Sequence, residues 1–181
     1  KRSVLVQSSK SDAMKLGKTI CAECNTARTQ QYDRAWERLS AYIKRNHRAL
    51  VGCEYIDLRD ALGSDYKLLK QYAQLYFVKV FGCRLVEEMP EVGLNYFRKH
   101  LMSGSACPRF FLAFALIERE SHDPRSAGVN PFSGDWERGF AQLELIGTAL
   151  NVGRLSVEMF YVPGDTGVRD FPGCWRASSS L

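Results

Sequence analysis

Apolar positions recur at helical spacing through the first hundred residues and gather into short runs after that. Residues 33–48 form the first amphipathic segment, and we expect a helix there. Its predicted apolar face consists of Ala35, Trp36, Leu39, Tyr42 and Ile43. Asp33 is the expected N-cap, because its carboxylate can accept hydrogen bonds from the unpaired amides of the first turn. Residues 49–58 are a short apolar run, for which we expect a strand or a buried connector.

Two further helices are predicted before residue 105. Residues 65–88 carry apolar side chains on a wide face, which is typical of a central helix packed on more than one side. Gly82 lies inside this helix and costs about 1 kcal/mol relative to alanine, so we expect a close helix crossing there. Pro90 permits a turn into a third helix over residues 91–102, and Gly104 is expected to end it.

The second half of the chain is rich in strand-like segments. We expect strands at about residues 109–117, 138–149 and 154–162, with a long loop over residues 118–135. The tight connection Asn151–Gly153 predicts that the last two strands form an antiparallel hairpin. The expected fold class is therefore α+β, in which packed helices are followed by a small antiparallel sheet.

The predicted elements divide the chain into three parts. Residues 1–50 would form an N-terminal knuckle-and-helix unit, residues 51–162 an α+β domain, and residues 163–181 an extended tail. The 181 residues, 45% of them hydrophobic, suffice for one domain with a sizeable core. No apolar run approaches the roughly 20 residues of a membrane-spanning helix, and no signal peptide is visible. We therefore expect no membrane partner and a cytoplasmic location.

Charge is distributed unevenly along the chain. The net charge is +5, and residues 1–28 carry six basic side chains against Asp12 and Glu23. A basic segment of this kind favours contact with phosphates, and Lys15, Lys18 and Arg28 are the candidate nucleic-acid-binding residues. The alternative is a solvated, charged tail without a ligand.

The chain has six cysteines, for which the alternatives are disulfides, free thiols and metal ligands. Cys53 and Cys83 lie within apolar runs, which favours buried thiols over a disulfide framework. Cys21 and Cys24 form a C-x-x-C pair, and such a turn places two thiolates suitably for one zinc ion. A redox C-x-x-C is the rival interpretation, but that motif opens a helix after a strand in a βαβ unit, which is not predicted here.

The segment around this pair resembles a known family. The run from Lys18 to Trp36, which contains ICAECNTARTQQYDRAW, is similar to the second zinc knuckle of HNH endonuclease-like proteins of bacteria and phages. The resemblance covers roughly residues 1–50. It implies a ββα unit around a catalytic metal, often supported by a structural zinc held by two C-x-x-C pairs. It also implies that Asn25 lies near the HNH metal site, with DNA as partner, in a prokaryotic or phage-infected cell.

Two parts of the family pattern are missing from this chain. No histidine precedes Cys21, so the general base is absent, and there is no first C-x-x-C pair. Hydrolysis of a phosphodiester needs both a base and a metal. An endonuclease activity is therefore expected only if an upstream segment supplies them, and the catalytic residues and the catalytic metal stay unassigned. Otherwise the chain is a relative that retains the scaffold alone.

Two other hypotheses remain open on the sequence. Glu118, Glu120 and His122 alternate along the predicted loop and would converge on a metal if the segment were extended; a solvated loop is the alternative. The α+β domain carries no nucleic-acid signature, which suits a phage or bacterial protein-interaction or inhibitor module. The expected function is thus nucleic-acid-directed and of HNH ancestry, with the interaction module as the alternative.

Overall fold

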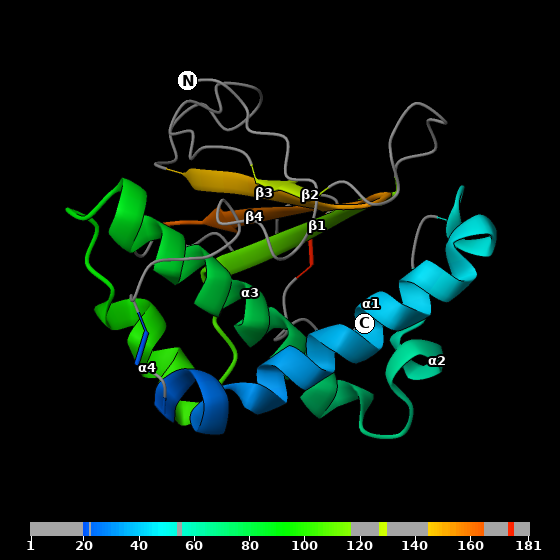
Figure 1. Ribbon diagram of the computed structural model, residues 1–181, viewed down its shortest axis with the longest axis horizontal. Coiled ribbons are helices and arrows are strands. Elements are labelled where there is room, and N and C mark those ends of the chain that lie inside the picture. The colour runs from blue at the N-terminus through cyan, green and yellow to red at the C-terminus, as the bar shows by residue number, and fades with distance from the viewer. Residues whose placement is uncertain are drawn as a thin grey trace. The chain divides into compact units, whose positions relative to one another are not determined.

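The computed structural model describes residues 20–21, 23–53, 56–116, 127–129, 145–164 and 174–175. These residues form two compact units, with the division between Cys107 and Pro108 (Figure 1). We call the described residues from 20 to 107 the helical unit and those from 108 to 175 the sheet unit. Helices and an antiparallel sheet are both present, which confirms the α+β fold class. None of the helices in the described part is long and apolar enough to cross a bilayer.

The first long helix begins earlier than predicted. A π-helical turn, η2 (Cys24–Arg28), leads through Thr29 into α1 (Gln30–Leu50). Asp33 therefore lies within the first turn of α1, and its prediction as the N-cap is wrong; Thr29 holds the N-cap position. The predicted apolar face is largely confirmed, because Ala35, Trp36, Leu39 and Ile43 are buried together with Tyr32.

The segment after α1 turns and then forms a short helix. α2 spans Leu58–Leu62, and the Asp57 side chain caps it by accepting a hydrogen bond of 2.7 Å from the Arg59 amide. The strand considered for residues 49–58 is not present in their described part. α1 extends to Leu50, a turn follows at residues 51–52, and the capped helix α2 begins at Leu58, so the run is divided between two helices and their connection. Gly63 ends α2 with a φ of 78°.

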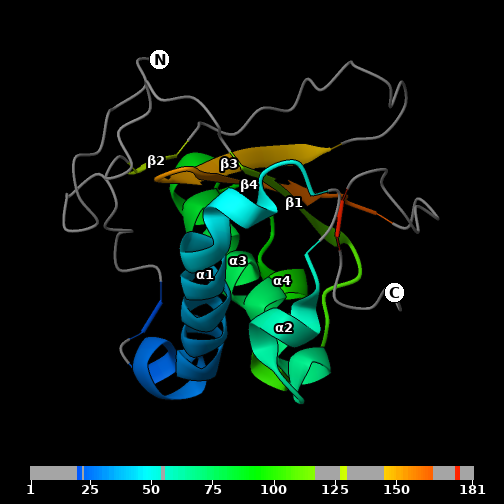
Figure 2. The same ribbon diagram turned by 90° about the vertical axis from the view of Figure 1, so that its right-hand side faces the viewer.

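α3 (Tyr66–Glu88) is the central helix of this unit, as predicted, and it packs against α1, α2 and α4 (Figure 2). α4 (Asn95–Ser103) ends at Gly104, which takes the left-handed conformation with a φ of 68°, so its predicted end is confirmed. α4 begins four residues late because residues 91–94 continue the turn. A Cβ at Gly82 would meet the Phe97 Cβ of α4 at 3.9 Å, so the expected helix contact exists but leaves room for a methyl group.

The sheet unit contains four antiparallel strands in the order β1-β4-β3-β2. They are β1 (Phe110–Leu116), β2 (Ala127–Val129), β3 (Ile146–Val152) and β4 (Leu155–Tyr161). The predicted hairpin is confirmed: β3 and β4 pair from Val152↔Leu155 onward, joined by Gly153 and Arg154. Gly153 has a φ of 59°, which suits the first position of a two-residue hairpin loop.

Two of the strand boundaries depart from the predictions. The loop expected over residues 118–135 contains β2, which pairs with β3 through Gly128↔Asn151; this part of the prediction is wrong. Three residues are too short a run for an alternating pattern to show in the sequence. The strand predicted over residues 138–149 overlaps β3 in its last four residues, and residues 138–144 lie outside the described residues.

One buried cluster of the sheet unit joins side chains of β1 and β4 to the residues just before β3 and just after β4. Phe111, Leu145, Phe160 and Val162 form a buried cluster, and Cys174 packs against it. Trp175 exchanges two backbone hydrogen bonds with Leu112, of 2.9 and 2.6 Å. The predicted C-terminal tail therefore returns to β1 at this position.

Candidate functional site

Cys21 and Cys24 lie on the turn that leads into η2 and α1. The Cys24 amide donates a hydrogen bond of 3.2 Å to the Cys21 Sγ, and the Asn25 amide donates one of 2.9 Å to the Cys21 carbonyl. Cys21 is exposed and Cys24 is partly exposed, and both are free thiols. We call residues 21–25 the Cys turn. Its two sulfurs lie at the surface, where a metal ion or a reagent can reach them.

Hydrogen bonding makes the two thiols unequal. The pKa of Cys21 is lowered because its sulfur accepts hydrogen bonds from the Cys24 thiol and from the Cys24 amide. The pKa of Cys24 is raised, chiefly because its thiol is the donor in that contact. Cys174 differs from both, since burial and the nearby Glu158 raise its pKa to about 11. Cys21 is thus the thiol prepared to act as a thiolate ligand.

The pair supplies two ligands, and a tetrahedral zinc site needs four. Within the described residues no group of three or more His, Cys, Asp or Glu side chains comes together. Cys83 and Cys107 are buried elsewhere in the helical unit. Glu118, Glu120 and His122 lie outside the described residues, as do Lys15 and Lys18. The residues present therefore fit half of a zinc site.

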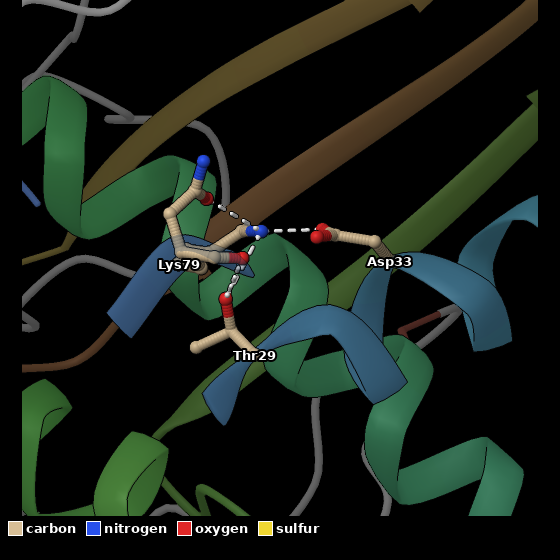
Figure 3. Close-up of polar contacts among 4 residues, drawn as sticks. Thr29, Asp33 and Lys79 are labelled. Atoms are coloured by element: carbon tan, nitrogen blue, oxygen red, sulfur yellow. Dashed lines mark hydrogen bonds and ion pairs between the residues drawn. The ribbon is translucent and has the colours of Figure 1, made fainter. Parts of the chain in front are cut away.

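A buried lysine fastens the Cys turn to the central helix (Figure 3). Lys79 of α3 donates hydrogen bonds of 3.4 Å to the Asn25 Oδ1 and of 3.4 Å to the Thr29 Oγ1, and it forms an ion pair with Asp33. The lysine side chain is only 9% exposed. Asn25, Thr29 and Asp33 are four residues apart, so this spacing brings all three to the side that faces α3. We call these four residues the Lys79 cluster.

The side chain of Tyr76 also lies beside the Lys79 cluster. The Lys79 Nζ lies 5.7 Å from the centre of the Tyr76 ring, within range of a cation–π contact. Burial and the adjacent Asp33 carboxylate raise the pKa of Tyr76 to about 12, so its phenol stays protonated. Removing one partner of a buried ion pair typically costs about 3–5 kcal/mol. The cluster thus holds the start of α1 in place.

The local sequence pattern did not indicate the role of Lys79, and it assigned Asp33 to a cap position that Thr29 holds. Lys79 follows three bulky apolar residues in a helix that is apolar on nearly every side. A lysine there needs an anionic partner, and Asp33 in the preceding amphipathic helix is a natural candidate. For Asn25 the structure shows a contact with Lys79, and its nearness to an HNH metal site stays a prediction.

Arg28 is the one predicted phosphate-binding residue that the described part includes. Its side chain is 51% exposed, and it pairs with Glu23 at 3.5 Å, an exposed contact that contributes little. A cavity of about 590 Å³ opens beside it, between η2, α1, α3 and α4. Its walls include Leu68 and Met102, each 49% exposed. The surface of the cavity is thus mostly polar, with two exposed apolar side chains and the Arg28 cation beside it.

A histidine and two serines close the end of α4. The His100 Nδ1 lies 3.0 Å from the Ser105 Oγ, which lies 2.7 Å from the Ser103 Oγ. Burial lowers the pKa of His100, and the positive charge of Lys99 adds to this effect. All three residues lie within five positions of one another, and Ser103 also bonds the His100 carbonyl at 3.4 Å. This arrangement caps the helix end and leaves the imidazole neutral.

The chain was also compared with known proteins. No protein-family model, no curated protein and no solved structure matches it.

Proposed function

We propose that this is a nucleic-acid-directed protein of HNH-nuclease ancestry, in which Cys21 and Cys24 hold a structural zinc ion. The observation that carries the proposal is the hydrogen bond from the Cys24 amide to the Cys21 sulfur in an exposed turn. Amides that point at sulfur stabilise its negative charge, and zinc binds the thiolate form. The described residues bring no third or fourth ligand to this pair, so two further ligands would have to complete the site.

The Lys79 cluster supports the proposal by holding the Cys turn in one conformation. A metal site binds well when its ligands are positioned before the ion arrives, because less ordering then accompanies binding. Asn25, next to Cys24, is held by Lys79 at 3.4 Å. The zinc would stabilise the fold in this region and take no part in a reaction there.

The proposed activity is the binding of nucleic acid, and it does not include hydrolysis of the phosphodiester. Lys15, Lys18 and Arg28 would contact phosphates next to the zinc, in the cytoplasm of a prokaryotic or phage-infected cell. A nuclease needs in addition a histidine base and the first Cys pair. Cleavage would therefore require an upstream segment that supplies both.

Zinc content tests the proposal directly. We expect about one zinc per chain by atomic emission on protein that has not met a chelator. The Cys21→Ser/Cys24→Ser variant should lose it, and Cys53→Ser, which alters an exposed cysteine outside the Cys turn, should keep it. Zinc that persists in the double variant, or is absent from the parent, contradicts the proposal.

Nucleic-acid binding needs its own measurement. In a gel-shift titration with double-stranded DNA, the association constant should fall steeply with salt, because phosphate contacts release counterions. Absence of any salt-dependent binding by the zinc-loaded chain would remove the nucleic-acid role while leaving the metal site intact.

The cavity favours a second candidate, a protein-interaction module. Leu68 and Met102 are two of the large apolar side chains that the described residues leave exposed, and both line the cavity beside Arg28. Exposed apolar side chains that lie together beside a cavity suit contact with a partner protein. Affinity capture that survives nuclease treatment and is lost in Leu68→Ser/Met102→Ser would support this function, whereas capture lost on nuclease treatment would support the first.

A further inference from the structure

The outward side of α1 carries a row of arginines, Arg34, Arg38, Arg45 and Arg48, with Ala41 between them. All five residues are exposed. At about 100° per residue their positions fall within an arc of about 80°, and at 1.5 Å per residue the row is about 21 Å long. We call these four side chains the arginine face.

The fold makes little use of the arginine face. The opposite side of α1 is buried through Tyr32, Ala35, Trp36, Leu39 and Ile43, and this side holds the helix in the unit. Among the described residues, none of the four arginines belongs to an ion pair. The Arg38 guanidinium lies against Gly63, where an added Cβ would come within 2.9 Å of its Nη2.

Neighbouring charges leave the face strongly basic. Lys44 is exposed on its flank and adds a fifth positive charge, and Glu37, also exposed, is the acidic residue beside it. Asp33 is turned to the other side of the helix, where it pairs with Lys79. The surface therefore suits an anionic partner with several charges in a row.

We propose that the arginine face binds the phosphate backbone of double-stranded DNA. This inference rests on the proposed function and names the surface that carries it. DNA presents one negative charge per roughly 1.7 Å of its axis, so a row about 21 Å long can meet several phosphates at once. Guanidinium groups match phosphate oxygens in pairs, which favours arginine over lysine in this role.

The same face suits other anionic partners less well. A protein partner would be expected to use buried aromatic or aliphatic side chains as well as charge. The large apolar side chains exposed in the described residues are Leu68, Val86, Met102 and Val152, and none is on α1. A membrane-surface helix would insert its apolar side into lipid, but the apolar side of α1 lies in the protein core.

The arginine face and the Cys turn belong to one continuous segment. η2 ends at Arg28 and α1 begins at Gln30, so the helix extends directly from the turn that bears the two cysteines (Figure 2). The Lys79 cluster fixes that junction to α3. The four arginines are therefore presented on a rigid helix, which limits the entropy lost on binding.

Salt-dependent binding of the full zinc-loaded chain to a duplex DNA tests the inference. The Arg34→Gln/Arg45→Gln variant should bind roughly tenfold more weakly at fixed salt, and the slope of log K against log salt should fall by about 2. The matched control is Arg98→Gln/Lys99→Gln, which removes two exposed charges from α4 and should leave both quantities nearly unchanged. Arg34→Lys/Arg45→Lys should retain the slope, because the charge stays.

The outcomes separate this inference from the proposed function. If the parent chain binds DNA and both glutamine variants behave alike, the arginine face is not the binding surface, although the proposed function survives. If the parent does not bind DNA at all, both fail. The choice of partner is overturned if a duplex RNA binds more tightly than DNA. It is also overturned if an acidic polypeptide displaces DNA at equal charge. Unchanged circular dichroism shows that the variants remain folded.

Discussion

The helical unit and the sheet unit differ in what they bury. Seven polar or charged side chains are buried in the described residues: Thr29, Lys70, Gln74, Lys79, Arg84, His100 and Thr148. Six belong to the helical unit, and only Thr148 belongs to the sheet unit. The helical unit thus relies on polar side chains in its interior, whereas the interior of the sheet unit is almost wholly apolar.

Hydrogen bonding explains the difference. Helices satisfy their own backbone, so contacts between them must come from side chains, whereas strands join one another through the backbone itself. Gln74 of α3 provides such a side-chain contact to the segment after α4: its amide group bonds both the Cys107 carbonyl, at 3.1 Å, and the Cys107 amide, at 3.0 Å. The Tyr32 hydroxyl likewise donates to the Leu101 carbonyl at 2.9 Å. The helical unit should therefore be sensitive to loss of a polar partner, and the sheet unit to changes in volume.

Loss of the Lys79 ammonium is expected to have the largest effect. Lys79→Met keeps the length of the side chain but leaves the Asp33 carboxylate without its ion-pair partner, and we expect a loss of about 3 kcal/mol in the free energy of unfolding. Urea unfolding measures it. Lys67→Met is the matched control, since Lys67 is exposed on the same helix and should change stability by about 0.5 kcal/mol or less.

A double-mutant cycle shows whether this loss belongs to the pair. If Asp33→Asn and Lys79→Met together cost about as much as either alone, the two side chains are coupled. Costs that simply add would show that the ion pair does not stabilise the helical unit.

Replacing a glycine by alanine should change stability in opposite directions in the two units. A Cβ at Gly147 of β3 would lie 3.1 Å from the Phe160 Cδ1, and Phe160 is part of a buried cluster, so the ring would have to move against its packed neighbours. Gly147→Ala should therefore destabilise by about 1–2 kcal/mol through overpacking. Gly82→Ala, the helical counterpart, has room at 3.9 Å and should stabilise by about 0.5–1 kcal/mol. Thermal unfolding of both variants provides the test; equal signs would contradict the comparison.

Acid should lower the stability of the helical unit through protonation of His100. This is the smallest of the expected effects. Its pKa in the folded protein lies below the ordinary value of 6.5, so the unfolded chain takes up the proton first as the pH falls. The contribution of His100 to the free energy of unfolding is thus fully present above pH 6.5. It declines below that pH, by at most about 1.4 kcal/mol per pH unit. Urea midpoints between about pH 7.5 and 5 should fall less in His100→Gln. If the urea midpoints of the parent and the variant fall equally with pH, His100 is not the cause of the acid sensitivity.

The elements that were predicted correctly are those whose sequence signal lies within the element itself. The apolar width of residues 65–88 indicated the central helix, Gly104 marked the end of α4, and the connection at Gly153 indicated the hairpin. Each of these signals lies within the element it describes. β2 could not be found in this way, because a three-residue strand is defined by its pairing with β3.

The candidate site was predictable only in part, for a related reason. The spacing of Cys21 and Cys24 identified the Cys turn, but the role of Asp33 depends on a lysine 46 residues away in the chain. The rule for helix caps considers only neighbours, so it assigned Asp33 to the wrong task. The arginine face could have been found from sequence, because the period that identified the apolar side of α1 also applies to its basic residues.

Trp175 has a practical consequence for the sheet. β1 is an outer strand, and at Leu112 its outward amide and carbonyl are both bonded to Trp175. Uncovered outer strands are templates on which other chains can add and aggregate. A version of the protein shortened before Cys174 would expose this edge, together with the ring of Phe114, whose centre lies 5.7 Å from that of Trp175. Such a shortened version should aggregate more readily than the parent chain.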